Sequence, residues 1–397
     1  MIVPEGHRTR DFRRVAVIIG TRPEAVKLAP VIDRLSESGW ATPTIIATGQ
    51  HRELLDGAFE VFGLVPDVDF DVYQPGATLE QLTARLLTAL GPALADLTPS
   101  AVVVQGDTTS TLTGALAGFY AGLPVAHVEA GLRTGDRTQP FPEEINRRLT
   151  SQIASLHCAP TARAEAALAA EGITGDEVLV TGNTVIDALQ ATVDKRLPWP
   201  ASLADLDTDS RRVLLVTAHR RESWGQGLRD VGVALGRLAR VRPDLLIVFP
   251  AHPNPLIREA VAPQVAGCDN VRLLDPLGYG LFARLLARAD LVLTDSGGIQ
   301  EEAPGLGTPV LVMRAVTERP EAVEAGCARL VGTDPDRIVD EVTRLLDDSA
   351  AHEAMAQVTN PFGDGRAAQR CVDALGWLLG HNPRPAPFVP DAAPAGR

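Results

Sequence analysis

The chain has 397 residues, of which 45% are hydrophobic and 22% are charged, and its formal net charge is −13. This length exceeds what one ordinary hydrophobic core accommodates, so two domains are expected. The acidic balance argues against a nucleic-acid-binding surface, although a few arginines and helix N-termini are enough to bind an anionic ligand.

The sequence also argues against a zinc site, a disulfide framework and a membrane span. Its four cysteines lie apart, without the C-x-x-C pair that is typical of structural zinc sites. No run of about 20 apolar residues is present to cross a bilayer. Several charged residues lie between positions 5 and 11, before any apolar run, which is unlike a signal peptide. We therefore expect a cytoplasmic protein that uses neither a metal nor a membrane partner.

In the first half of the chain, short apolar runs alternate with longer segments of helical period. Strands are predicted at residues 15–19, 44–47, 101–104 and 124–128, with helices such as 24–37 and 79–97 between them. Continuous apolar runs suit parallel strands that are covered on both faces. The alternation is typical of a doubly wound α/β domain.

The alternation pauses at residues 194–210, which are rich in Pro, Asp and Trp, and then starts again. A second series of strands is predicted at residues 213–217, 245–249, 291–294 and 310–313. We therefore predict an α/β protein with two Rossmann-like doubly wound domains that face each other. The expected divisions are a disordered N-terminus at 1–12, a first domain at 13–185, a second domain at 186–365, a helix at 366–381 that crosses back to the first domain, and a disordered tail at 382–397.

The most unusual polar residues of the first half follow its predicted strands. In open α/β sheets, ligands bind outside the carboxyl ends of the strands. The candidates at these ends are Arg22, Lys27, Asp107, Glu129, Glu143 and Arg147. Alternatives remain for two of them: Asp107 is also placed to cap a helix, and Glu143 with Glu144 is also typical of a first helical turn. Taken together, the carboxylates suggest acid/base chemistry on a bound anion.

The second half offers a histidine with two arginines and a glycine turn. His219 follows the first strand of this half, although a hydrogen-bonded strand-end histidine is an alternative. Residues 295–302 follow a later strand and open a helix, where Ser296, Gly297 and Gly298 leave N–H groups to bind an anion such as a diphosphate. Glu302 is placed to accept hydrogen bonds from sugar hydroxyls.

Several common motifs are missing from the sequence. No G-x-G-x-x-G follows the first strand, and neither G-x-x-x-x-G-K nor H-E-x-x-H is present. A nucleophile of the G-x-S-x-G type is also absent. The chemistry is therefore expected to need no cofactor.

Seven segments together resemble the non-hydrolysing UDP-N-acetylglucosamine 2-epimerases. They are GTRPE at 20–24, HVEAGLRT at 127–134, PEEINR at 142–147, HRRE at 219–222, DSGGIQEE at 295–302, TERPE at 317–321 and PFGDG at 361–365. The resemblance covers residues 14–380, with the segments in the order and at the spacing of the family.

The resemblance implies a GT-B-like architecture with a cleft, and interconversion of UDP-GlcNAc and UDP-ManNAc. It implies that UDP is eliminated to give 2-acetamidoglucal and is then added back. A cytoplasmic homodimer that serves cell-envelope polysaccharide biosynthesis is the corresponding expectation for assembly and role.

The family also implies roles for individual residues. Asp107 and Glu143 are the expected acid/base pair, and Glu129 is expected to support or orient them. His219 is expected near the leaving diphosphate. The residues expected to hold UDP are Arg22, Ser296, Gly297, Gly298 and Glu302, with Lys27, Arg147 and Arg319 as secondary candidates. Gln50 and His252 resemble parts of a regulatory site for a second UDP-GlcNAc.

One position departs from the family pattern. Arg314 is followed by Ala315, where the family commonly has a polar residue, and this puts the fine substrate preference in question.

Three other functions compete with the epimerase. They are a GT-B glycosyltransferase with a separate acceptor, a hydrolysing 2-epimerase that releases UDP and ManNAc, and a non-catalytic sensor of nucleotide sugars. The carboxylates at the strand ends favour the epimerase.

Overall fold

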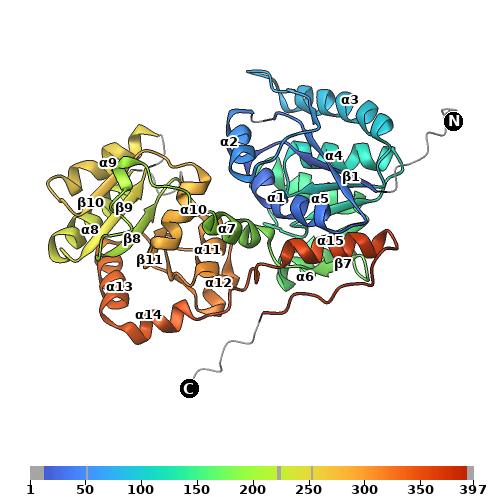
Figure 1. Ribbon diagram of the computed structural model, residues 1–397. Coiled ribbons are helices and arrows are strands. Elements are labelled where there is room, and N and C mark those ends of the chain that lie inside the picture. Colours follow the sequence, from blue (N-terminus) through green and yellow to red (C-terminus); the bar gives the residue numbers. More distant parts are fainter. Residues whose placement is uncertain (1–12, 51, 221–224, 252–253, 391–397) are drawn as a thin grey trace. The chain divides into compact units, whose positions relative to one another are not determined.

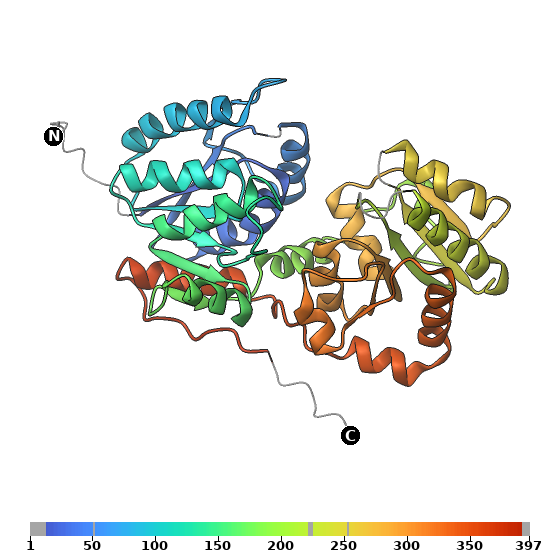
Figure 2. The ribbon, with the colours of Figure 1, turned by 180° about the vertical axis from the view of Figure 1, so that it is seen from behind.

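The computed structural model describes residues 13–50, 52–220, 225–251 and 254–390. The chain divides into two compact units (Figures 1 and 2). Unit 1 comprises Met1–Ala188 and Gly363–Val389, and unit 2 comprises Leu189–Phe362 and Pro390–Arg397. No helix in the described part of the chain has the length and apolar character that a bilayer span requires.

Unit 1 is built on a seven-stranded parallel sheet with the order β3-β2-β1-β4-β5-β6-β7. The strands are β1 (Arg14–Ile19), β2 (Thr42–Ala47), β3 (Val68–Asp69), β4 (Ala101–Gln105), β5 (Val125–Val128), β6 (Leu156–Ala159) and β7 (Val178–Val180). The strand order reverses between β1 and β4, the position at which open α/β sheets bind ligands.

The helices of unit 1 pack on the sheet and on one another. They are α1 (Arg22–Glu37), α2 (Arg52–Phe62), α3 (Leu79–Leu97), α4 (Thr109–Tyr120), α5 (Glu143–Ile153), α6 (Ala162–Ala170) and α15 (Ala367–Leu378), and α7 (Thr184–Asp194) leads into unit 2. Helix α4 packs between α3 and α5, whereas α1 packs against α2 and α15.

Helix α4 packs closely against the sheet at two of its buried residues, which are glycines. A Cβ atom at Gly114 would come within 2.8 Å of Ile18, and one at Gly118 would come within 3.0 Å of Val125. Larger side chains would push the helix away from β1 and β5. The close packing fixes the start of α4, and with it the turn that carries Asp107.

Unit 2 has a six-stranded parallel sheet with the order β10-β9-β8-β11-β12-β13. Its strands are β8 (Arg212–Thr217), β9 (Leu245–Pro250), β10 (Val271–Leu274), β11 (Leu291–Thr294), β12 (Val310–Val312) and β13 (Ala328–Leu330). Its helices are α8 (Gln226–Val241), α9 (Pro255–Val265), α10 (Tyr279–Arg288), α11 (Gly297–Glu302), α12 (Pro320–Ala325), α13 (Pro335–Asp347) and α14 (Ser349–Ala356).

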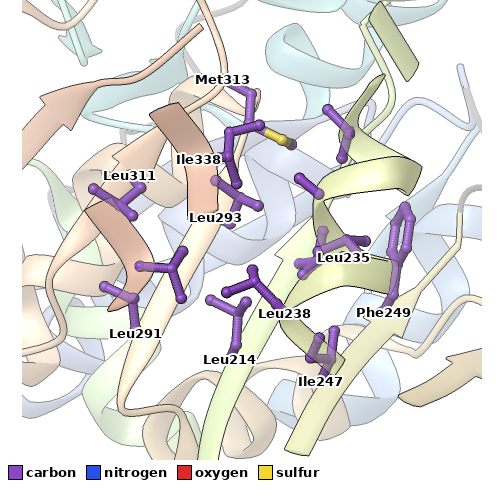
Figure 3. Packing of buried hydrophobic residues seen from close by; sticks show 14 of the residues in the cluster. Leu214, Leu235, Leu238, Ile247, Phe249, Leu291, Leu293, Leu311, Met313 and Ile338 are labelled. Carbon is purple, nitrogen blue, oxygen red and sulfur yellow. The ribbon is translucent and has the colours of Figure 1, made fainter. Parts of the chain in front are cut away.

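Both faces of the unit 2 sheet are buried in separate apolar clusters. On one face, Leu214 packs with Leu238 of α8 and Ile338 of α13 (Figure 3). On the other face, Val213 and Leu215 pack in a second cluster. Neighbouring residues of a strand point to opposite faces, so two covered faces need apolar side chains at every position. This explains the continuous apolar runs in the sequence and confirms the predicted fold class.

The C-terminal segment lies in unit 1. Helix α15 packs on α1 and β6, and Asp187 of α7 accepts hydrogen bonds from the backbone N–H groups of Ala367 (3.2 Å) and Ala368 (2.9 Å) at the start of this helix. Burial raises the pKa of Asp187 to about 6, although these hydrogen bonds oppose the shift.

The predicted disorder of the tail is wrong for residues 382–390. Phe388 is buried, and its N–H donates to the carbonyl of Val180 in β7 at 2.7 Å. Arg384 donates to the carbonyl of Val178 at 2.8 Å. The Pro- and Ala-rich composition suggested disorder, but one buried aromatic ring and a few backbone contacts hold the segment. Residues 1–12 and 391–397 lie outside the described residues.

Candidate functional site

Asp107 lies in the turn between β4 and α4, at the carboxyl edge of the unit 1 sheet. The cap of α4 is Thr108, whose Oγ1 accepts from the N–H of Thr111 at 3.1 Å, so the alternative that Asp107 caps this helix is wrong. The Asp107 carboxylate accepts instead from Nη2 of Arg147 at 2.6 Å, and its side chain is 29% exposed. Asn146 donates to the Asp107 backbone carbonyl at 2.9 Å.

Glu143 and Glu144 both lie in the first turn of α5, but their surroundings differ. Glu144 is fully buried and accepts from the N–H of Thr134 at 3.0 Å, with Arg148 at 3.3 Å. The side chain of Glu143 is partly exposed and forms no hydrogen bond or ion pair within the described residues. Glu144 therefore holds the preceding loop, whereas the Glu143 carboxylate is available to a ligand.

Glu129 follows β5 and is the most constrained of the candidate carboxylates. Its side chain accepts from Nζ of Lys27 at 2.5 and 2.7 Å, from Nδ2 of Asn183 at 2.9 Å and from Nε2 of Gln105. Its backbone has φ +63°, which costs a non-glycine residue about 1–2 kcal/mol. Such strain at a strand end is typical of functional sites. Lys27 thus neutralises a carboxylate of unit 1.

Glu24 joins two turns at this edge, and the sequence reasoning missed it. One carboxylate oxygen accepts from the N–H groups of Gly20 and Thr21, both at 2.6 Å. The other accepts from the hydroxyls of Thr108 at 2.6 Å and Thr111 at 2.9 Å. Burial raises the pKa of Glu24, and the four hydrogen bonds oppose that shift. The signal in the sequence was the capping-box spacing from Thr21 to Glu24.

Two further candidates lie beside these turns. Arg22 is the first residue of α1, and its exposed side chain has no hydrogen bond or ion pair in the described part of the chain. Gln50 accepts through Oε1 from the N–H (3.2 Å) and hydroxyl (2.8 Å) of Ser110, so it holds the start of α4. His252, the other proposed regulatory residue, lies outside the described residues.

In unit 2, His219 follows β8 and is oriented by Asp295, which follows the neighbouring strand β11. Nδ1 of His219 lies 3.0 Å from the Asp295 carboxylate, which also accepts from the N–H groups of His219 and Arg220 at 2.9 Å. Burial alone would raise the pKa of Asp295, but these hydrogen bonds lower it below its ordinary value. The His219 side chain stays 42% exposed, so a ligand can reach it.

The glycine turn at the start of α11 lies beside two guanidinium groups. A Cβ atom at Gly297 would lie 3.6 Å from Nη2 of Arg220 and 4.0 Å from Cζ of Arg319. A Cβ atom at Gly298 would lie 3.5 Å from Oε1 of Glu302. Ser296, Gly297, Gly298, Glu302 and Arg319 were all predicted to lie in one site, and the structure brings them together.

Arg220 and Asp295 lie in segments that the sequence analysis noted, but it gave neither residue a role. Their only signal was their position in the HRRE and DSGGIQEE segments. Ala315, at the departure from the family pattern, is exposed. Within the described residues, no cluster of three or more His, Cys, Asp or Glu side chains is arranged to hold a metal ion.

Carboxylates at the strand ends of unit 1 suit acid/base chemistry, and arginines beside the glycine turn of unit 2 suit a phosphate group, as in an enzyme that acts on a phosphorylated substrate. A family model described as UDP-N-acetylglucosamine 2-epimerase matches residues 33–376. The chain belongs to this family.

Known members are similar over nearly their full length. The UDP-N-acetylglucosamine 2-epimerase of Escherichia coli (strain K12) is 48% identical over 369 residues, which cover 91% of this chain and 98% of the relative. The crystal structure of a putative UDP-N-acetylglucosamine 2-epimerase from Listeria monocytogenes has a TM-score of 0.90 at 41% identity, covering 95% and 99% of the two chains. The Neisseria meningitidis UDP-GlcNAc 2-epimerase, solved with UDP-GlcNAc bound, has a TM-score of 0.80 at 41% identity, covering 91% and 99%.

Proposed function

We propose that this chain interconverts UDP-GlcNAc and UDP-ManNAc without net hydrolysis. A base removes the proton at C2 while the bond from C1 to the diphosphate oxygen breaks, and UDP leaves with that electron pair. The product is 2-acetamidoglucal, with a double bond between C1 and C2. Protonation of C2 on the opposite face and attack of UDP on C1 complete the inversion. Atoms and charges balance without an added oxidant or reductant.

The departure of UDP carries much of this reaction. No carbonyl group lies next to C2 in the sugar ring, so its hydrogen is not acidic. Positive charge must therefore develop at C1 as the bond to the diphosphate oxygen breaks. Groups that stabilise negative charge on the leaving diphosphate lower this barrier.

In unit 1, we assign Asp107 and Glu143 as the acid/base pair. Inversion needs proton transfer on two faces of the sugar, so one carboxylate does not suffice. The observation that carries the proposal is the difference between the three carboxylates. Glu129 is held by Lys27 and two amides, Asp107 by a single arginine, and Glu143 has no partner in the described part of the chain. Glu129 therefore suits a fixed orienting charge, and the other two suit proton transfer.

In unit 2, we assign the UDP-binding role to the residues around the glycine turn. Arg220 and Arg319 approach Gly297, and guanidinium groups with backbone N–H donors are suited to a diphosphate. His219, oriented by Asp295, is assigned to the leaving diphosphate, and Glu302 to the ribose hydroxyls. Arg22 of unit 1 is a further candidate for UDP.

Proton NMR of the purified protein with UDP-GlcNAc in D₂O tests the proposal. We expect a UDP-ManNAc anomeric signal to appear and deuterium to enter at C2, without added metal or NAD. Free UDP with ManNAc would instead indicate the hydrolysing reaction. The absence of any change would contradict the epimerase and favour a glycosyltransferase or a sensor. A matched sample of the Asp107→Asn/Glu143→Gln double variant controls for a contaminating enzyme.

Three expectations from the family stay predictions. Assembly as a homodimer is checked by light scattering of the purified protein, and a cytoplasmic location by cell fractionation. Activation by a second UDP-GlcNAc through Gln50 and His252 would appear as sigmoidal dependence of the reverse reaction on UDP-GlcNAc.

A further inference from the structure

Charges of both signs surround the glycine turn of unit 2. The cations are Arg220, Arg314 and Arg319. Besides Glu302, which lies beside Gly298, the carboxylates are Asp295, Glu301 and Glu318. Asp295 is committed to His219 and the Arg220 backbone, and Glu301 accepts from Nε of Arg319. Glu318 accepts from Arg220 at 3.3 and 3.4 Å and lies 3.5 Å from Nη2 of Arg314. Glu318 is thus the carboxylate that faces two of the arginines.

The three carboxylates differ in how far they are able to move. The Asp295 side chain is 0% exposed and that of Glu301 is 4% exposed. Moving either one would leave a buried charge without its partner, which is costly. The Glu318 side chain is 46% exposed, so it is able to rotate into solvent and remain hydrated. Its contacts with Arg220 are also longer than the usual ion-pair hydrogen bond.

Glu318 is a charged group at neutral pH. Partial burial would raise its pKa, but Arg220 and Arg314 lower the pKa below its ordinary value. An ionised carboxylate on Arg220 presents the same chemistry to that guanidinium as one oxygen pair of a phosphate. Arg220 also approaches Gly297, where the proposed diphosphate site lies.

We propose that Glu318 is a displaceable counter-ion that competes with the diphosphate of UDP for Arg220 and so sets the affinity for the nucleotide. This inference rests on the proposed UDP-binding role of unit 2. When a diphosphate binds, Glu318 moves to solvent and Arg220 turns to the phosphate oxygens. Breaking the Arg220–Glu318 pair costs free energy, and this cost weakens the binding of every ligand that carries the diphosphate.

The size of the effect follows from the exposure of the pair. Exposed ion pairs contribute little to stability, and removing such a competitor corresponds to about a two- to fivefold gain in affinity. The full-length Glu318→Gln variant keeps the shape of the side chain and removes its charge. We expect it to bind UDP about two- to fivefold more tightly, and to bind uridine, which has no phosphate, as the wild type does.

Isothermal titration calorimetry measures the Kd for UDP and the Kd for uridine, on the wild type and on Glu318→Gln. Glu341→Gln is the matched control, because Glu341 of α13 also pairs with two arginines, Arg329 and Arg344, at 2.8 and 3.1 Å. The control should bind UDP as the wild type does. Repeating the titrations at higher NaCl should reduce UDP affinity more steeply for Glu318→Gln, because the Glu318 carboxylate no longer offsets part of the charge of Arg220.

The outcomes separate this inference from the proposed function. UDP binding by the wild type, with equal or weaker binding by Glu318→Gln, would overturn the counter-ion role and leave the UDP site standing. Equal tightening for UDP and uridine would also overturn it, since the effect would not involve phosphate. The absence of UDP binding by the wild type would overturn the proposed function and this inference together.

Discussion

Arg147 holds Asp107 from one turn along the helix that begins with Glu143. Its Nη2 lies 2.6 Å from the Asp107 carboxylate, and residues four apart in a helix lie on the same face. Helix α5 therefore carries one member of the proposed acid/base pair and orients the other. The turn before α4 places the Asp107 backbone, and α5 orients the Asp107 carboxylate relative to Glu143.

The orienting role of Arg147 predicts a loss of rate in Arg147→Lys. Lysine keeps the charge but lacks the planar fork that fixes the carboxylate, and misplacement of a reacting group costs up to about 100-fold. We expect kcat to fall by about 10- to 100-fold with little change in the Kd for UDP, measured by NMR kinetics and calorimetry. A weaker Kd with an unchanged kcat would show that Arg147 binds phosphate, as its secondary assignment allows.

Glu143 and Glu144 form a matched pair for testing catalysis against stability. Glu143→Gln should lower epimerisation by about 10²- to 10⁴-fold and leave the thermal midpoint unchanged, because Glu143 has no partner within the described residues. Glu144→Gln should lower the thermal midpoint, because a neutral amide cannot replace this fully buried carboxylate beside Arg147 (3.7 Å) and Arg148 (3.3 Å). Near-normal epimerisation by both Glu143→Gln and Asp107→Asn would refute the acid/base assignment.

The contacts of Glu24 predict that removing its charge and removing its hydrogen bonds have different effects on stability. In Glu24→Gln, one oxygen still accepts from Gly20 and Thr21, and the amide can donate to the two threonine hydroxyls. In Glu24→Ala, buried donors lose their acceptor, at about 1–3 kcal/mol each. Urea unfolding should therefore show a large decrease in the free energy of unfolding for the alanine variant and a small change for the glutamine variant. Equal losses in both would show that the charge matters more than the hydrogen bonds.

The raised pKa of Asp187 predicts a pH-dependent term in stability. Because the folded protein holds this proton up to about pH 6, against an ordinary value of 3.8, stability from this group decreases as pH rises between these values. The shift of roughly two pKa units corresponds to up to about 3 kcal/mol. The neighbouring charge of Asp364 contributes to the raised pKa.

Asp187→Asn removes this titration and keeps one acceptor for the start of α15. The free energy of unfolding of the variant relative to the wild type should therefore increase as pH rises from 4 to 7, measured by urea unfolding at each pH. A difference that does not change with pH would mean that Asp187 titrates near its ordinary value when folded.

The sequence predicted the parts of the structure that depend on local pattern. Apolar runs such as residues 101–104 identified buried parallel strands, and the strand-end rule located Asp107, Glu129 and Glu143. The contacts of these residues could not be predicted in the same way, because they join distant positions. Glu24 meets Thr108 across 84 residues, and Arg220 meets Glu318 across 98. No periodicity in the sequence records such pairings.

The tail shows the opposite error, in which composition outweighed a specific contact. Residues 382–390 are rich in proline, yet Phe388 is buried, with the Arg370 guanidinium 5.3 Å from its ring centre. A single aromatic side chain is enough to hold a short segment if a receptive surface exists, and that surface is visible only after folding.

Unit 1 is built from two separate stretches of the chain, and this affects the order in which the units can fold during synthesis. Helix α15, which covers α1 and β6, is synthesised after all of Leu189–Phe362. Domains fold as units during synthesis, starting from the N-terminal side, but here the first unit lacks helix α15 until residues well beyond Phe362 have left the ribosome. The Leu189–Phe362 part of unit 2 can therefore finish folding first, and a nascent chain stalled after Phe362 would expose to chaperones the apolar surface of unit 1 that α15 covers.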